Sequence, residues 1–187
     1  MTESRAFNYS KLFAADAPIS TRSENLHAKY DFAVAYPDPD TLPLTELIDS
    51  LKTAIDREGR DLAYYPSPLG LPALRQLVSE KLSRDRDIHV SAEEIVLTSG
   101  SGEAILMLIQ ALTNPGDVVL TEEYVYSGTL RQMKLFGSDV RSVPCDDDGL
   151  IPQALEDVIR KAESENKPIK YLYTIPCFQN PLGWTMS

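Results

Sequence analysis

The sequence predicts an α/β protein in which helices cover a mostly parallel β-sheet. From Glu94 onward, short apolar segments rich in β-branched residues alternate with longer amphipathic segments. Strands that are separated by helices of about ten or more residues pair in parallel and are joined by right-handed crossovers. The composition agrees, since 43% hydrophobic and 25% charged residues are ordinary for a globular protein.

The chain is predicted to divide into a first segment, residues 1–60, which begins with an N-terminal arm, and a main domain, residues 61–187. Residues 1–30 show little hydrophobic periodicity, which is typical of an arm rather than of a helix or strand. A strand-like piece follows and runs into a turn at Pro37 and Pro39, because closely spaced prolines break regular structure.

Two amphipathic helices are predicted between that turn and the alternating region. Apolar residues recur at helical spacing from Pro43 to about Glu58, and Gly59 is a plausible stop. Pro72 is predicted to open the second helix, which extends through Lys81. Proline is tolerated in the first turn, because the N–H groups there have no acceptor within the helix.

Four strands and three further helices are predicted in the alternating region. The expected strands are residues 94–98, 118–121, 139–144 and 169–175. The expected helices are residues 103–112, a segment that ends near Phe136, and residues 152–164. The acidic turn "CDDDG" is predicted to be solvated rather than metal-binding, because its adjacent aspartates lack ligand spacing.

Composition and charge exclude several classes of function. The net charge of −10 repels nucleic-acid phosphates, and no basic stripe counters it. No apolar run reaches the roughly 18 residues that a membrane span needs, so a cytoplasmic location is the default expectation. The two cysteines and two histidines are isolated, which argues against a disulfide framework or a metal site.

Three predicted strands end in residues that could contact a ligand. "TSGSGEA" joins a strand to a helix, and its glycines, the Ser101 hydroxyl and the helix N-terminus suit a phosphate group. "EEYVYSG" places Tyr124 and Tyr126 after the next strand, and "YLYTIPCFQNPLGW" places Asn180 after the last one. In open α/β sheets, ligands bind at the carboxyl ends of the strands.

Each of these features also has a purely structural interpretation. The glycines can serve a turn with positive φ, the tyrosines can be half-buried aromatics, and Asn180 can be a turn residue. Their occurrence together at three successive strand ends favours a pocket for a planar, phosphorylated cofactor that accepts hydrogen bonds.

Three segments resemble the class I/II aminotransferases of the fold-type I pyridoxal-phosphate superfamily, nearest the aminoadipate/kynurenine and aromatic branch. They are "YYPSPLGLPALR", "LTSGSGEAILMLIQALTNPGDVVLTEEYVYSGTL" and "YTIPCFQNPLGWTMS". The resemblance implies a three-layer α/β/α large domain that is incomplete in this chain. It implies further that strands 118–121, 139–143 and 169–175 are contiguous, whereas 94–98 pairs with strands from the C-terminal half of the enzyme.

The same resemblance implies roles for residues at the cofactor. Ser101 and Gly102 would hold the phosphate of pyridoxal 5′-phosphate, and Tyr126 would stack on its pyridine ring. Asn180 would donate a hydrogen bond to the 3′ oxygen of the ring. Tyr65 would reach the cofactor of a neighbouring subunit in a homodimer, and Tyr64 is an alternative for that role.

Ala35 and Tyr36 match the family segment that lies over the substrate. The resemblance thus implies that residues 1–60 form the N-terminal arm and a small-domain or substrate-loop segment, and that residues 61–187 are the N-terminal part of the large cofactor-binding domain. The implied reaction moves an amino group from an L-amino acid, aromatic or aminoadipate-like, to a 2-oxo acid such as 2-oxoglutarate. No lysine of this chain matches the family's Schiff-base lysine, which lies C-terminal to Asn180. We therefore expect no catalytic residue in the chain itself, and the fragment alone to be inactive.

Two other hypotheses about the function remain open. One is a different fold-type I reaction, either a lyase reaction or the formation of a carbon–carbon bond. The other is a non-catalytic, effector-binding module such as those of transcription regulators that resemble aminotransferases. Such regulators carry an N-terminal winged helix, and residues 1–30 are too short to form one.

Overall fold

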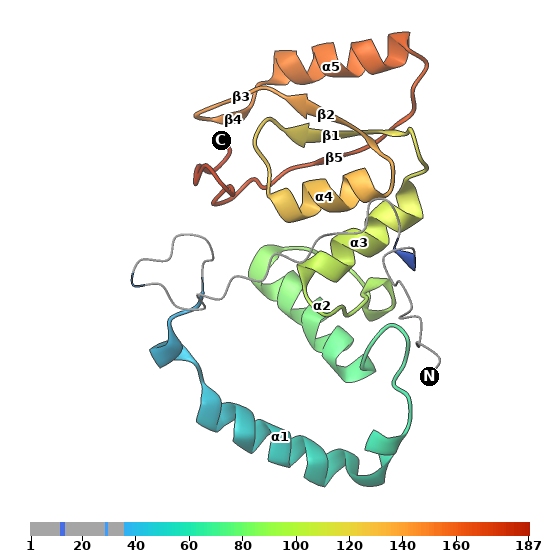
Figure 1. Cartoon of the computed structure of the whole chain (residues 1–187). Helices are drawn as coiled ribbons and strands as arrows, with labels where there is room; N and C mark the ends of the chain where they lie inside the picture. Colours follow the sequence, from blue (N-terminus) through green and yellow to red (C-terminus); the bar gives the residue numbers. More distant parts are fainter. Residues whose placement is uncertain (1–11, 14–28, 30–35) are drawn as a thin grey trace, which may run out of the picture. The chain divides into compact units, whose positions relative to one another are not determined.

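The computed structural model describes residues 12–13, 29 and 36–187 (Figure 1), and the chain divides into two units at the boundary between Ala63 and Tyr64. Each unit is described by itself. The strand-like piece before Pro37 and the substrate residue Ala35 lie outside the described residues. The domain boundary expected at residue 60 stays a prediction.

The first unit consists, in its described part, of one α-helix between two short 3-10 helices. The elements are η2 (Pro39–Thr41), α1 (Leu44–Glu58) and η3 (Gly59–Ala63). The predicted stop is confirmed, because α1 ends where Gly59 adopts a φ of 55° and donates its N–H to the carbonyl of Ile55. No residue of α1 is buried, and its apolar face is exposed over Leu44, Leu47, Ile48, Leu51 and Ile55.

The second unit begins with α2 (Pro72–Arg86), followed by η4 (Ala92–Glu94). Two side chains of α2 hold the returning segment against the helix. Arg75 Nη1 donates to the carbonyl of Ala92 at 2.7 Å, and Ser79 Oγ donates to the carbonyl of Val90 at 2.5 Å.

The strand predicted at residues 94–98 is wrong for this structure. Residues 92–94 form η4 instead, and residues 95–98 pair with none of the described strands. Ile95 has extended dihedrals (φ −106°, ψ 129°), and the N–H of Leu97 donates to the carbonyl of Leu69 at 3.0 Å. The β-branched pattern predicted the extended backbone correctly, but a strand also needs a neighbour, which local sequence does not specify.

The three remaining predicted strands form one parallel sheet in the order β2-β1-β5, which confirms that they are contiguous. The strands are β1 (Val118–Glu122), β2 (Asp139–Val143) and β5 (Ile169–Tyr173). The helices of this region are α3 (Ser101–Leu112), α4 (Ser127–Leu135) and α5 (Pro152–Ser164), and a hairpin joins β3 (Cys145–Asp146) to β4 (Gly149–Leu150). β5 ends two residues before the predicted limit, because the N–H of Ile175 donates to the carboxylate of Glu122.

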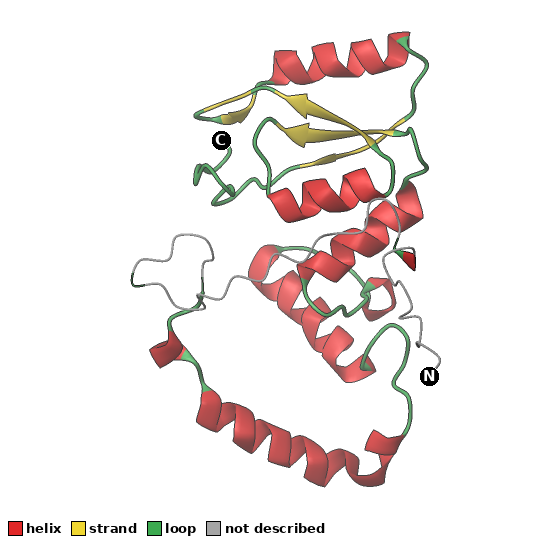
Figure 2. Cartoon of the chain, viewed as in Figure 1, coloured by secondary structure: helices red, strands yellow, loops and turns green. Residues whose placement is uncertain are grey.

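Helices cover both faces of this sheet, with α5 on one face and α4 on the other (Figures 1 and 2). Val118 and Leu120 of β1 pack with Ala162 of α5, whereas Val119 packs with Ile109 of α3 and Met133 of α4. Successive residues of a strand point to opposite faces, so one apolar strand serves two cores. The three-layer α/β/α fold is therefore confirmed for the part of the domain that is present.

An ion cluster ties the amino ends of the strands together. Asp139 accepts from Arg141 at 3.0 Å and from Lys167 at 2.6 Å, and Arg141 also contacts Glu165. Hydrogen bonds from Arg141 first, and then from Lys167, lower the pKa of Asp139, and Arg141 likewise lowers the pKa of Glu165. Carboxylates with a depressed folded-state pKa stabilise the fold above their unfolded pKa and lose that contribution as the pH falls through the folded value.

Two further features of the described residues bear on function. Among them, no helix has both the length and the apolarity to cross a membrane. Nor does the described part of the chain gather three His, Cys, Asp or Glu side chains into a group suited to a metal ion.

Candidate cofactor site

One pocket of about 350 Å³ lies where β1 and β5 end and α3 and α4 begin. Four residues predicted from the sequence line it together: Ser101, Gly102, Tyr126 and Asn180. The remaining lining residues are Ile105, Gly128, Thr129, Gln132, Tyr173 and Ile175. Segments up to 79 residues apart in sequence thus meet at the carboxyl edge of the sheet, where α/β proteins bind ligands.

The N-terminus of α3 forms one wall and is suited to an anion. Gly100 precedes the helix with a φ of 86°, which favours glycine, and no described side chain caps this end. The first N–H groups of an α-helix have no acceptor within the helix, so those of Ser101 and Gly102 are available to a ligand. A Cβ added at Gly102 would meet no atom within 4 Å, so this turn is open. An anionic group such as phosphate fits here.

Tyr126 directly precedes α4, and its side chain is 50% exposed. The ring lies close to the first turn of this helix. A Cβ added at Gly128 would lie 2.5 Å from Cε1 of Tyr126 and 3.1 Å from its hydroxyl. Only a residue without a side chain allows the ring this position.

Asn180 lies in the segment that follows β5, residues 174–184, which we call the Asn180 loop. The side chain lines the pocket and makes no hydrogen bond with any described residue, so its amide is available to a ligand. The peptide bond to Pro181 is cis. Phe178, two residues earlier, has a φ of 51° and an exposed ring.

A buried carboxylate that sequence reasoning missed lies at the end of β1. The Glu122 side chain is fully buried. One carboxylate oxygen accepts from the hydroxyl of Thr174 at 2.5 Å and from the N–H of Ile175 at 3.0 Å. The other accepts from Nε2 of Gln179 at 2.8 Å. All three donors belong to the Asn180 loop.

Gln179 was missed as well, although it directly precedes Asn180. Its side chain is 2% exposed, and its Nε2 donates both to Glu122 and to the carbonyl of Tyr124, at 2.6 Å. Its Oε1 accepts from the N–H of Leu182 at 2.8 Å. The only hint in the sequence is an acidic residue that closes an otherwise apolar strand, "VVLTE", because such a residue needs buried donors.

Two contacts connect α4 with the other walls of the pocket. Gln132 Nε2 donates to the carbonyl of Gly102 at 3.3 Å, and the hydroxyl of Thr129 donates to that of Tyr173 at 3.3 Å. Neither contact could be predicted from the sequence, because the two partners lie 30 and 44 residues apart in the chain.

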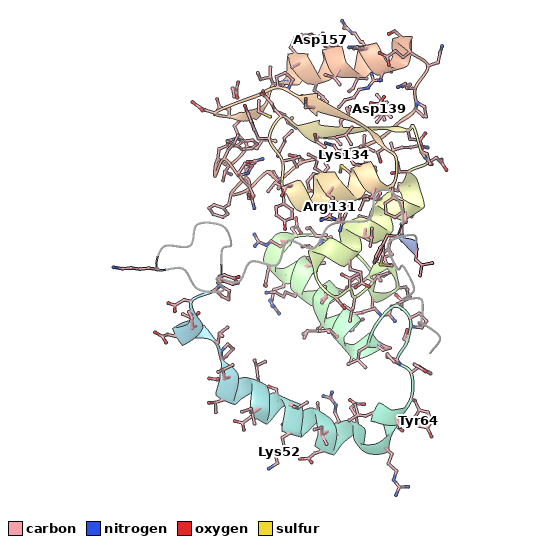
Figure 3. The ribbon with its side chains drawn as sticks, viewed as in Figure 1. Lys52, Tyr64, Arg131, Lys134, Asp139 and Asp157 are labelled. Carbon is pink, nitrogen blue, oxygen red and sulfur yellow. The ribbon has the colours of Figure 1, made fainter. Side chains whose placement is uncertain are left out.

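The other predicted site residues within the described part of the chain do not line this pocket. Tyr65 is fully exposed, and Tyr64, which Figure 3 labels, is largely exposed. Tyr36 is exposed in the first unit. Tyr124 contributes its carbonyl to Gln179, but its ring is not part of the pocket lining.

No lysine of the described residues lines the pocket either. Lys170 lies within β5 near its amino end and pairs with Asp117 at 3.3 Å. Lys134 belongs to α4, where Figure 3 labels it.

Comparisons with known proteins agree on one family. The sequence profile of the class I and II aminotransferases matches residues 34–187. Aromatic-amino-acid aminotransferase 1 of Thermococcus litoralis is 32% identical, over 81% of this chain and 36% of the relative. An uncharacterized HTH-type transcriptional regulator of Escherichia coli is also 32% identical, over 83% of this chain and 32% of its own length.

A solved structure gives the same result. The kynurenine aminotransferase of Pyrococcus horikoshii, in complex with PMP, KYN and KYA, matches with a TM-score of 0.71 and 32% identity. The match covers 81% of this chain and 37% of that one. The chain therefore spans well under half the length of these relatives, and it belongs to the class I and II aminotransferases.

Proposed function

We propose that this chain is the N-terminal portion of a pyridoxal-phosphate-dependent aminotransferase. The observation that supports this most is the convergence of the α3 N-terminus, the Tyr126 ring and the Asn180 amide on one pocket. A phosphate, an aromatic ring and a hydrogen-bond acceptor are the three recognisable parts of that cofactor, and each has a matching wall.

Each wall would have a separate task. The N–H groups at Ser101 and Gly102, with the Ser101 hydroxyl, would bind the phosphate and anchor the cofactor. Tyr126 would fix the plane of the ring by stacking. Asn180 would donate to the 3′ oxygen and favour its anionic form. When bound, pyridoxal phosphate supplies the electron sink that weakens the Cα–H bond of an amino acid.

The finer assignment follows the branch of the family that the sequence resembles. We propose an L-amino acid of aromatic or aminoadipate type as amino donor and a 2-oxo acid such as 2-oxoglutarate as acceptor. The exposure of Tyr65 supports a homodimer in which this side chain reaches the neighbouring subunit's cofactor. The catalytic lysine would come from sequence outside residues 1–187, since no lysine lines the pocket in the described part of the chain.

The test uses the native protein, purified from its source through a tag on this chain so that any continuation or companion chain is retained. With bound cofactor and an aromatic L-amino acid, but no acceptor, we expect one equivalent of 2-oxo acid and of pyridoxamine phosphate per site. After borohydride reduction and digestion, the pyridoxyl-lysine peptide should map outside residues 1–187. A labelled lysine within these residues, or the absence of 2-oxo acid, contradicts the proposal.

A second candidate is an effector-binding module of a regulator, which the similarity to the Escherichia coli HTH-type regulator favours. The same purified material separates the two. A regulator would bring a helix-turn-helix domain in the same polypeptide and would bind the cofactor without turnover to the 2-oxo acid.

Gly128→Ala tests whether the Tyr126 ring contributes to cofactor binding. Because the new Cβ would lie 2.5 Å from the Tyr126 ring, the ring should swing away and cofactor affinity should fall severalfold. The fold should persist, since alanine stabilises a helix by about 1 kcal/mol relative to glycine. Equilibrium binding of pyridoxal phosphate and a thermal melt measure the two effects. Ser127→Ala, one residue away, should change neither, and equal affinities for the two variants would contradict the stacking role.

A further inference from the structure

We propose that Glu122 and Gln179 are positioning residues that set the place of the Asn180 amide relative to the Tyr126 wall. The inference rests on the proposed function, because it assigns a task to residues behind the same pocket. Neither side chain lines the pocket, so each would act through its neighbours.

The first step concerns the burial of Glu122. A carboxylate removed from water is costly unless donors replace the lost hydration. Among the described residues, no cation pairs with Glu122, and its three hydrogen bonds all come from residues 174–179. Hydrogen bonds to an ionised acceptor are about twice as strong as neutral ones. The Asn180 loop is thus fixed to the end of β1, the most completely buried strand.

The second step concerns the amide of Gln179. Its two N–H bonds go to Glu122 and to the carbonyl of Tyr124, and its oxygen accepts from Leu182. One side chain therefore joins three segments: the end of β1, the turn two residues before Tyr126, and the chain on the far side of Asn180. A displacement of the Gln179 amide would therefore move Tyr126 and Asn180 relative to each other.

The third step concerns the backbone of the loop. Phe178 has a φ of 51°, a region that bulky residues adopt only when the surroundings dictate it. The N–H of Phe178 donates to the hydroxyl of Thr185 at 3.3 Å, and that of Gln179 donates to the carbonyl of Trp184 at 2.8 Å. Asn180 itself makes no hydrogen bond with the described residues, so its placement depends on these neighbours.

The test is a double-mutant cycle in the native protein, with the dissociation constant of pyridoxal phosphate as the readout. Glu122→Gln keeps the shape but replaces one acceptor oxygen by an NH₂ group. At least one donor of the Asn180 loop must then face another donor. We expect affinity to fall by about tenfold, within the range for residues of one hydrogen-bond network.

In an Asn180→Ala background, Glu122→Gln should lower the affinity for pyridoxal phosphate by less than about threefold, because the amide that Glu122 positions is already gone. Equal losses in both backgrounds, or no loss in the first, would overturn the inference. Glu123→Gln is the matched control: it makes the same charge change at the next residue, which is exposed and hydrogen-bonded to no described residue through its side chain. It should leave the dissociation constant unchanged.

Thr174→Val serves as a milder variant if Glu122→Gln does not fold. It removes only the Thr174 hydroxyl that donates to Glu122. The loss of affinity for pyridoxal phosphate should be smaller, and it should again depend on the presence of Asn180. The visible circular dichroism of the bound cofactor should change with affinity in both variants, whereas a purely structural role would lower only the melting temperature.

Amide exchange of the cofactor-free protein separates this inference from the proposed function. Glu122→Gln should accelerate exchange at Gln179 and Gly183, whose N–H groups are hydrogen-bonded within the loop, while β1 stays protected. If the native protein does not bind pyridoxal phosphate but the loop amides respond, the proposed function fails alone. If cofactor binds and the loop amides do not respond, the positioning role fails alone.

Discussion

Produced without any other protein, residues 1–187 are expected to self-associate, bind a hydrophobic dye and unfold without a sharp transition. The physical reason is exposed apolar surface. On α3, Met107, Leu108 and Leu112 are about half exposed and border two apolar grooves of about 200 and 370 Å³. Contiguous apolar surface of this kind is typical of interfaces rather than of free monomers.

The edge of the sheet adds to this expectation. β5 is paired only with β1, so its other edge presents unpaired N–H and C=O groups. An open edge of this kind is a template for pairing with another chain, so it favours association of the isolated chain. If the chain is the N-terminal portion proposed above, the rest of that protein should cover this edge and the grooves beside α3.

Calorimetry, light scattering and amide exchange measure the outcome. Leu108→Glu should make the isolated chain more soluble but weaken the native protein, because the same face is covered there. Gln110→Glu adds the same charge on α3 at a residue that lines neither groove, so it should have little effect on either. A cooperatively folding monomer with protected amides at residues 94–98 would contradict the expectation.

The second large effect is expected for Asn180→Ala in the native protein. A hydrogen bond to a charged group is worth about 1.5–3 kcal/mol, which corresponds to a loss of about 10- to 150-fold in cofactor affinity or turnover. The melting temperature without cofactor should hardly change, because the amide makes no hydrogen bond with the described residues. Titration with pyridoxal phosphate, followed by absorbance, gives the affinity.

Asn180→Asp is the decisive companion variant. Aspartate keeps the size and the turn preference of asparagine but replaces the amide donor by an acceptor. If Asn180 donates to the 3′ oxygen, aspartate should bind cofactor at least as weakly as alanine, because two anionic oxygens would face each other. If aspartate retains the affinity that alanine loses, Asn180 is a turn residue and its assigned role is wrong.

Local sequence signals predicted most of the elements and most of the pocket. Gly59 and Pro72 marked the end of α1 and the start of α2 because their own backbone limits set those boundaries. Ser101, the pair Tyr124 and Tyr126, and Asn180 were found because parallel strands bring their carboxyl ends to one edge, and the family resemblance then selected Tyr126. This rule requires only that the sheet is parallel, and it does not require knowledge of side-chain contacts.

The sequence could not predict features that depend on distant partners. Glu122 and Gln179 are 57 residues apart, and their contact follows only once the register of β1 against β5 is known. Residues 94–98 have the composition of a strand, but strand formation requires a neighbour at the sheet. The role of Tyr65 depends on a second subunit, so it stays a prediction.

The ion cluster of Asp139, Arg141, Glu165 and Lys167 lies at the opposite end of the strands from the pocket. Groups that are far apart and share no partners contribute almost independently to stability. Substitutions in the loops after β1 and β5 can therefore accumulate without loosening the far end of the sheet. Loops that bind the ligand can therefore change what they bind while the scaffold that carries them persists.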